Sequence, residues 1–261
     1  MESGLESKGD MAIKPYFTSE NLEELSRSFN QIDSDRDDIL LKFAQHKFSN
    51  EAAYEYAAQG LLRRISILHR CIKNIFLITP PANMLPLTKD ASADLSINLQ
   101  SFILNVFGAI DNIAWIWAKE KSLTLGKTDI GLKPRHLKLR NTLSPDFQSY
   151  LSRFNQWFEY LENYRDALAH RIPLYVPPFS LTKQETERHF DLEKQMLSAL
   201  SSHEFDKYES LKDEQESLGR FYPWMMHSHL EESVPVVFHA QVLADWATVI
   251  DIANNFYVEI S

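Results

Sequence analysis

The sequence predicts an all-α protein, a helical bundle of four to five core helices, for three reasons. Apolar residues recur at steps of three and four along several long segments, which is the spacing of one face of an α-helix. Only 7 glycines occur in 261 residues, which argues against a turn-rich all-β fold and against a glycine-rich nucleotide loop. A hydrophobic content of 44% is that of a packed globular protein.

Two long helices are predicted in the first third of the chain. Residues 1–18 are expected to be a flexible lead, and a first helix begins at Ser19 behind a serine cap. A second helix is predicted over residues 49–78, where one apolar stripe is followed by three prolines that end the helix. Three alternating acids after the first helix start resemble a calcium loop only in part, so a solvated helix connection is expected there: Asp33, Asp35 and Asp37.

The clearest helix is predicted over residues 93–119. Its main apolar stripe contains seven residues: Leu95, Leu99, Phe102, Val106, Ile110, Ile113 and Trp117. A second stripe on the opposite side contains Ile97, Leu104 and Trp115. A helix that is apolar nearly all round is central in its domain or shared with a partner. Asp111 falls on the second side, where a carboxylate needs a cation or donors, or else reaches solvent.

The second half of the chain is predicted to contain a core helix over residues 144–171 and a closing helix over 239–260. Between them, charged helices over 182–200 and 204–218 and a short hairpin over 221–238 form a surface insertion. We therefore expect residues 19–261 to form a single helical domain with an insertion at about 180–238.

Composition limits the compartment and the partners. The formal net charge of -9 gives no global attraction for nucleic acid, so phosphate binding has to use a local basic patch. The single cysteine, Cys71, excludes an internal disulfide and fits a reducing compartment. The first ten residues are polar, and the most apolar run, 102–118, contains polar side chains that disfavour a membrane span. We expect a cytoplasmic protein with no membrane segment.

One local basic patch is present. Four cations gather within eight residues of an otherwise acidic chain: Lys133, Arg135, Lys138 and Arg140. They are expected to form either a solvated loop or a contact to phosphate groups.

The most informative stretch runs from Tyr164 to Pro173. Followed from residue 144, the apolar stripe steps through Arg165, and a guanidinium at a core or interface position needs a partner. Asp111 is one candidate partner. Asp166 and His170 are four residues apart on one helical ridge, where the carboxylate would orient the imidazole and favour its charged form.

An arginine that holds a phosphate and a histidine that moves a proton are enough to cleave RNA through its own 2′-hydroxyl, with no metal or cofactor. The alternative is ordinary helix stabilisation, because an Asp–His pair four apart is common and cations in the last turn, here His170 and Arg171, favour the helix dipole.

The Arg-Asp-x-x-x-His segment resembles the Arg-x4-His signature of the HEPN (higher eukaryotes and prokaryotes nucleotide-binding) superfamily. The resemblance implies a helical bundle, usually a homodimer with two motifs meeting at its interface. It also implies a metal-independent endoribonuclease of a toxin–antitoxin, phage-defence or RNA-processing system, or a protein that only binds RNA or nucleotides. Arg165, Asp166 and His170 would be the catalytic residues. Lys133, Arg135, Lys138, Arg140 and Arg171 would extend the RNA path.

Alternatives remain open. Arg64 and His69 have the same spacing, but they lack a polar residue after the arginine and an aromatic helix before it. A non-catalytic helical module that binds a cognate toxin or nucleotidyltransferase suits the acidic charge. His227 and His229 on an extended strand have a spacing that can bind a metal, although no third ligand is fixed by the pattern.

Overall fold

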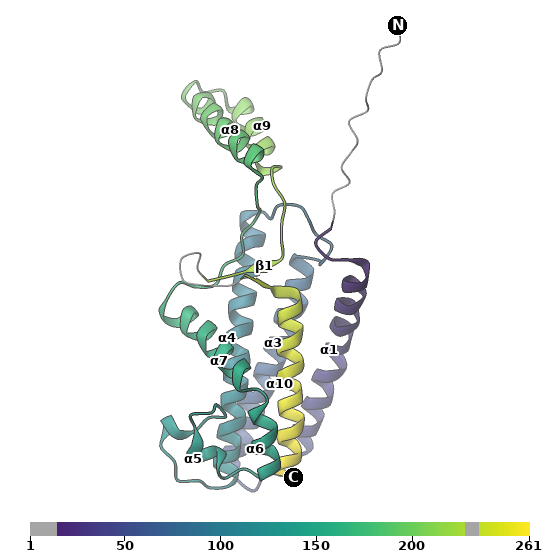
Figure 1. Cartoon of the computed structure of the whole chain (residues 1–261), viewed down its shortest axis with the longest axis vertical. Helices are drawn as coiled ribbons and strands as arrows, with labels where there is room; N and C mark the ends of the chain where they lie inside the picture. Colours follow the sequence, from purple (N-terminus) through teal and green to yellow (C-terminus); the bar gives the residue numbers. More distant parts are fainter. Residues whose placement is uncertain (1–14, 228–234) are drawn as a thin grey trace.

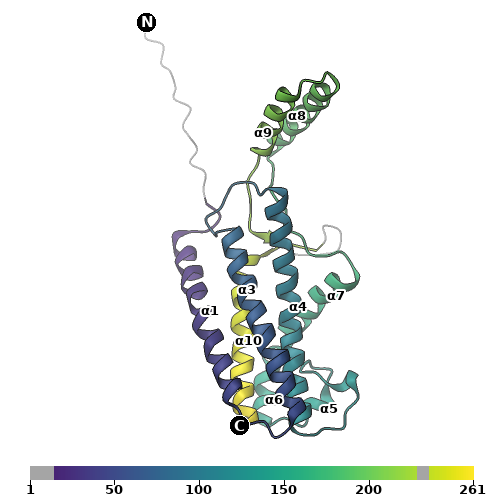
Figure 2. The same cartoon turned by 180° about the vertical axis from the view of Figure 1, so that it is seen from behind.

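The computed structural model describes residues 15–227 and 235–261. Its core is four long helices that run side by side: α1 (Ser19–Gln45), α3 (Leu62–Ile78), α4 (Lys89–Glu120) and α10 (Phe238–Ile260) (Figures 1 and 2). A fifth helix, α7 (Asn155–His170), packs obliquely on α4. The predicted all-α class is therefore confirmed.

The chain enters the bundle one residue earlier than expected. Thr18, and not Ser19, caps α1, because its hydroxyl accepts a bond from Asn21 N (3.2 Å) while the Asn21 side chain accepts one from Thr18 N (3.3 Å). Phe17 is 9% exposed and belongs to the core. Residues 1–14 of the expected lead lie outside the described residues.

The solvated connection expected at Asp33, Asp35 and Asp37 is wrong, because α1 continues through all three. Each acid has its own partner on a different side of the helix. Asp33 pairs with His69 Nε2 (2.6 Å) and Lys73 Nζ (2.7 Å) of α3, and Asp35 accepts a bond from Trp246 Nε1 of α10 (3.0 Å). These bonds join α1 to its neighbours instead of forming a calcium loop.

The helix predicted over residues 49–78 is one continuous helical path in three parts. α2 (Glu51–Glu55) leads into a π-helical segment, η1 (Tyr56–Leu61), and then into α3. α4 begins at Lys89, behind a Thr88 cap, four residues before the predicted start. The main stripe predicted for α4 is buried throughout. The second stripe is not: Ile97 is 63% exposed and Leu104 is 44% exposed.

The single helix predicted over residues 144–171 is wrong, because the chain turns at Arg153 and Phe154. α6 (Pro145–Ser152) ends in tightened turns, with Arg153 N bonded to Tyr150 O (3.2 Å) and Phe154 N bonded to Leu151 O (3.1 Å). The Ser152 hydroxyl also bonds Ser149 O (2.6 Å) and competes for a helix carbonyl. α7 then starts at Asn155. The segment before them carries the 3-10 turn η2 (Lys127–Asp129) and the short helix α5 (Leu137–Arg140).

The predicted insertion is a projecting arm. Two antiparallel bridges, Tyr175–Met226 and Ser180–Arg220, form its stalk. Beyond the stalk, α8 (Lys183–Ser201) and α9 (Phe205–Glu216) pack on each other and stand off from the bundle (Figures 1 and 2). At the base, β1 (Trp224–Met225) pairs with β2 (Val236–Val237), which confirms a short hairpin in this region.

One helix of the described chain, α4, is long and apolar enough to cross a membrane by composition alone. Over half of its most apolar window, 56%, is buried inside the bundle. This burial is what a core helix of a soluble protein shows.

Candidate functional site

The predicted site residues of α7 lie at the edge of its contact with α4. The buried side of α7 is formed by Phe158, Leu161, Tyr164 and Ala167. Arg165 is only partly buried, because the buried positions of α7 continue from Phe158 and Leu161 to Tyr164 and Ala167 and not to Arg165. Its side chain is 29% exposed.

Arg165 is held in place by two neighbours. Its Cζ lies 4.6 Å from the centre of the Phe107 ring of α4, and its Nη1 lies 3.1 Å from Asp166 Oδ1. Its Nε is buried and has no hydrogen-bond partner among the described residues. An unpaired buried donor costs free energy, about 1–3 kcal/mol or more when charged. A ligand can reach the exposed part of the guanidinium but not the buried Nε.

His170 is the last residue of α7 and is exposed. Within the described chain it makes no hydrogen bond, and the expected bond from Asp166 is not formed because Asp166 faces Arg165 instead. The imidazole is therefore open to solvent and to a ligand, but this structure does not orient it through Asp166.

Asp111 lies among cations without a direct ion pair. Burial raises the pKa of its carboxyl group, while the charges of Lys133, Arg165 and Arg64 lower it. Within the described residues, no cation approaches Asp111 within 4 Å, so the expected pairing with Arg165 is reduced to an interaction through space. Asp111 thus marks the point on α4 where three positive side chains converge.

A second cation shares the Phe107 ring. Lys133 Nζ lies 3.9 Å from the ring centre and 3.1 Å from Glu162 Oε1, with the lysine only 5% exposed. Arg135 binds the same carboxylate, at 2.7 Å from Nη2. Burial alone would raise the pKa of Glu162, but the bonds from Arg135 and Lys133 outweigh it and lower that pKa. This network fixes the basic loop against α7.

The other predicted RNA-contacting residues are also engaged. Lys138 is exposed but pairs with Asp129 (2.9 Å). Arg140 is 8% exposed and donates to Asn155 Oδ1 (3.3 Å), so it lies inside the fold. Arg171 is exposed and donates to Asn163 O (3.1 Å). Of the predicted RNA path, Lys133 and Arg140 are thus buried, while Arg135, Lys138 and Arg171 are on the surface.

One cation at this surface was not among the predicted site residues. Arg64 reaches from α3 across to α4, where Asn105 and Asn112 accept its hydrogen bonds. Its signal in the sequence is the set of polar and small positions on one side of an otherwise apolar helix: Asn105, Gly108 and Asn112.

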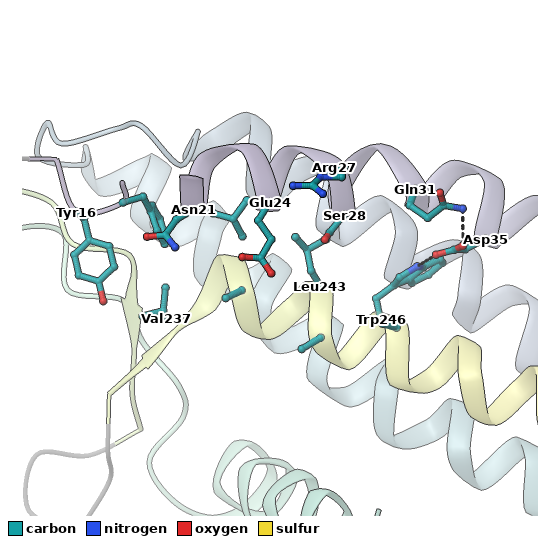
Figure 3. A pocket seen from close by; sticks show the side chains of 15 residues that line it. Tyr16, Asn21, Glu24, Arg27, Ser28, Gln31, Asp35, Val237, Leu243 and Trp246 are labelled. Atoms are coloured by element: carbon teal, nitrogen blue, oxygen red, sulfur yellow. Dashed lines mark hydrogen bonds between the residues drawn. The ribbon is translucent and has the colours of Figure 1, made fainter. Parts of the chain in front are cut away.

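A cavity with none of these residues lies between α1 and α10. It is a groove of about 830 Å³ that begins at Tyr16 and runs to Trp246 (Figure 3). Glu24 and Arg27 line its α1 side, and a hydrogen bond from Gln31 to Asp35 (3.1 Å) closes its far end. None of the predicted catalytic residues lines this groove.

The metal site considered for His227 has no counterpart in the described chain. No group of three or more His, Cys, Asp or Glu side chains that could hold a metal ion occurs among the residues described. His227 is 5% exposed and packs edge-on against Tyr164, with ring centres 5.6 Å apart. His229 lies outside the described residues.

No family model, curated protein or solved structure matches this chain. The resemblance to HEPN proteins expected from Arg165, Asp166 and His170 therefore stays a prediction.

Proposed function

We propose that this protein is a metal-independent endoribonuclease of HEPN type, with Arg165 and His170 as its catalytic residues. The observation that supports the proposal best is Arg165 itself. It is a partly exposed guanidinium held on Phe107, five residues before an exposed histidine on the same helix. In this proposal Asp166 positions Arg165, and it does not orient His170.

The reaction uses the substrate's own nucleophile. The 2′-oxygen attacks the adjacent phosphorus and the bond from phosphorus to the 5′-oxygen breaks, which leaves a 2′,3′-cyclic phosphate and a 5′-hydroxyl. His170 removes the proton of the 2′-hydroxyl, and water protonates the leaving 5′-oxygen. Arg165 donates hydrogen bonds to the phosphate oxygens as negative charge develops on them. No metal or cofactor is required by these steps.

A homodimer is part of the proposal. Five residues of α-helix turn a side chain by about 140° and advance it by about 7.5 Å, so one α7 does not direct both side chains to one phosphate. Two copies related by a two-fold axis can bring Arg165 of one helix and His170 of another to the same substrate. RNA or a nucleotide is the proposed ligand, and the cytoplasm is the proposed compartment.

The test is RNA cleavage in excess chelator by purified protein, compared with Arg165→Ala and His170→Ala. Wild-type protein is expected to cleave, and each variant is expected to lose at least about 100-fold in rate, as is usual when a charge-stabilising or a proton-transfer group is removed. Arg27→Ala, which removes an exposed cation on α1 outside the predicted RNA path, serves as the charge-matched control and is expected to cleave like the wild type. Cleavage that persists unchanged in His170→Ala would overturn the mechanism.

A second candidate, a non-catalytic module for a cognate protein partner, is favoured by the arm. α8 exposes Phe190 (57%) and Leu197 (62%) on the side away from α9. The segment 183–216 has twice as many acidic as basic residues, which suits a basic protein surface better than RNA. A stoichiometric co-purifying protein that is lost in Leu197→Glu, together with no RNA cleavage, would favour this candidate.

A further inference from the structure

We infer that Arg64 is a second phosphate-binding position, at the place where α3 meets Asn105, Gly108 and Asn112 of α4. Its ligand is a phosphodiester group of the same single-stranded RNA whose cleavage is proposed for Arg165 and His170. The inference rests on that proposed function for the identity of the ligand. The site itself is argued from the contacts of Arg64.

The guanidinium of Arg64 is fixed by two neutral acceptors. Its Nε donates to Asn112 Oδ1 (2.9 Å) and its Nη1 donates to Asn105 Oδ1 (3.0 Å). The Asn105 amide is itself oriented, because its Nδ2 donates to Ser101 O (2.8 Å). The planar group is therefore pre-organised, and little side-chain freedom is left to lose when a ligand binds.

Two glycines make room for this arrangement, one on each side of the contact between α3 and α4. A Cβ on Gly108 would lie 2.4 Å from Arg64 Cζ, so the guanidinium rests directly on the backbone of α4. A Cβ on Gly60 would lie 2.7 Å from Asn112 Nδ2. Because neither glycine has a side chain, Arg64 and Asn112 can lie directly against the backbone at these two positions.

The charge of Arg64 is not neutralised by a direct partner. Lys133, Arg135 and Lys138 each contact a carboxylate, whereas no carboxylate lies within 4 Å of Arg64 in the described chain. Its Nη2 has no hydrogen-bond partner among the described residues and is not buried. Arg64 therefore presents a free donor and a full positive charge at the surface, which is the combination that binds a phosphate oxygen.

The surroundings suit a strand rather than an isolated anion. Arg165 lies over the ring of Phe107 and Arg64 lies against Gly108, so the two arginines contact adjacent residues of α4. One to two helical turns further along the contact, Tyr56 and Trp115 stack with ring centres 5.2 Å apart, and Lys119 Nζ lies 5.5 Å from the Trp115 ring. Alternating cations and partly exposed aromatic rings are the elements of single-strand binding surfaces.

The test is binding of a fluorescein-labelled 12-nucleotide single-stranded RNA in excess chelator, with His170→Ala as the parent to prevent cleavage. Arg64→Ala is expected to weaken binding at least about tenfold, the usual effect of losing a hydrogen bond to a charged group. The slope of log affinity against log salt is expected to fall by about 0.7, which corresponds to one phosphate contact on a single strand. Arg63→Ala, the exposed neighbour on α3, is the matched control and is expected to change affinity less than about twofold.

Gly108→Ala separates a positioned contact from a general effect of charge. The added Cβ displaces the guanidinium but leaves the net charge unchanged. If the position of Arg64 matters, this variant loses affinity as Arg64→Ala does. If only charge matters, it binds like the parent. Its circular dichroism and melting temperature show whether it is folded, and Arg64→Lys gives a second charge-conserving variant should Arg64→Ala unfold.

Three outcomes are decisive. If Gly108→Ala and Arg64→Ala bind RNA as tightly as the parent does, and the wild-type protein cleaves RNA, the inference is overturned and the proposed function stands. No RNA binding by the parent would overturn both. If inorganic phosphate or AMP displaces the RNA at a concentration equal to that of the RNA, Arg64 binds a free anion and the inference is overturned. If displacement needs a large excess of phosphate or AMP, the result supports binding of an RNA strand.

Discussion

Arg64 lies on Gly108 so closely that a Cβ at that glycine would be 2.4 Å from Arg64 Cζ. The contact joins two central helices through a cation and a backbone instead of through apolar side chains. It explains why a glycine and two asparagines interrupt an otherwise apolar helix.

Gly108→Ala is expected to leave stability within about 1 kcal/mol of wild type, although it displaces Arg64. Alanine favours the helix by about 1 kcal/mol over glycine, and this offsets much of the two lost hydrogen bonds of about 1 kcal/mol each. Urea denaturation measures the free energy of unfolding. A loss of several kcal/mol would mean that the contact is mainly structural.

The buried Asp245 of α10 predicts a pH dependence. It is 2% exposed, and burial raises its pKa to about 6, although Trp157 Nε1 (2.8 Å) and Gln241 Nε2 (2.9 Å) donate to it and favour the charged form. The fold therefore prefers the protonated acid more than the unfolded chain does. The stabilisation that the protonated Asp245 gives to the folded state is full below about pH 4 and is lost as pH rises through about 6.

Asp245→Asn is thus expected to stabilise the protein by on the order of 2–3 kcal/mol at pH 7.5 and to change little at pH 4. Urea midpoints at the two pH values measure this. An effect of equal size at both would contradict the assignment.

His239 predicts the opposite dependence. It is 1% exposed, burial lowers its pKa to about 4, and its Nε2 donates to Thr79 O (2.6 Å). The fold holds the neutral ring, so its contribution is full above pH 6.5 and is lost as pH falls through about 4.

In the Asp245→Asn background, which removes the opposing carboxyl group, the urea midpoint is expected to fall as pH drops from 7 to 4. His239→Gln keeps a donor for Thr79 O and is expected to flatten that fall. An unchanged slope would show that His239 does not cause it.

The arm is expected to be dispensable for folding of the bundle. Ser180 and Arg220 exchange backbone bonds of 2.7 and 3.0 Å, so a two-residue Asn-Gly turn can replace residues 181–219. The shortened chain is expected to lose the helical signal of α8 and α9 while its melting temperature stays within a few degrees. Collapse of cooperative melting would show that the arm supports the core.

The sequence predicted the bundle because helix periodicity is local and strong. The buried stripe of α4 from Leu95 to Trp117 follows directly from its spacing, and so do both arm helices. The break at Phe154 could not be predicted in this way, because it depends on turn bonds that leave the apolar spacing almost unchanged.

The site was less predictable than the fold. The basic segment was visible, but its neutralisation by Glu162 depends on a contact between a loop and a helix far apart in sequence. In the sequence, Arg64 is followed by an apolar residue and is not singled out as a site residue. Its significance comes from its contacts with Gly108 and Asn112, some 45 residues away. Spacing identifies faces of helices and does not show which faces meet.

The most direct test of the proposed function is the chemistry of the RNA ends. Wild-type protein in excess chelator is expected to cut RNA but not DNA of the same sequence, and to leave 2′,3′-cyclic phosphate and 5′-hydroxyl ends that are absent with His170→Ala. Intact RNA across a broad set of sequences, or products with 5′-phosphate ends, would contradict a reaction through the 2′-hydroxyl at Arg165 and His170.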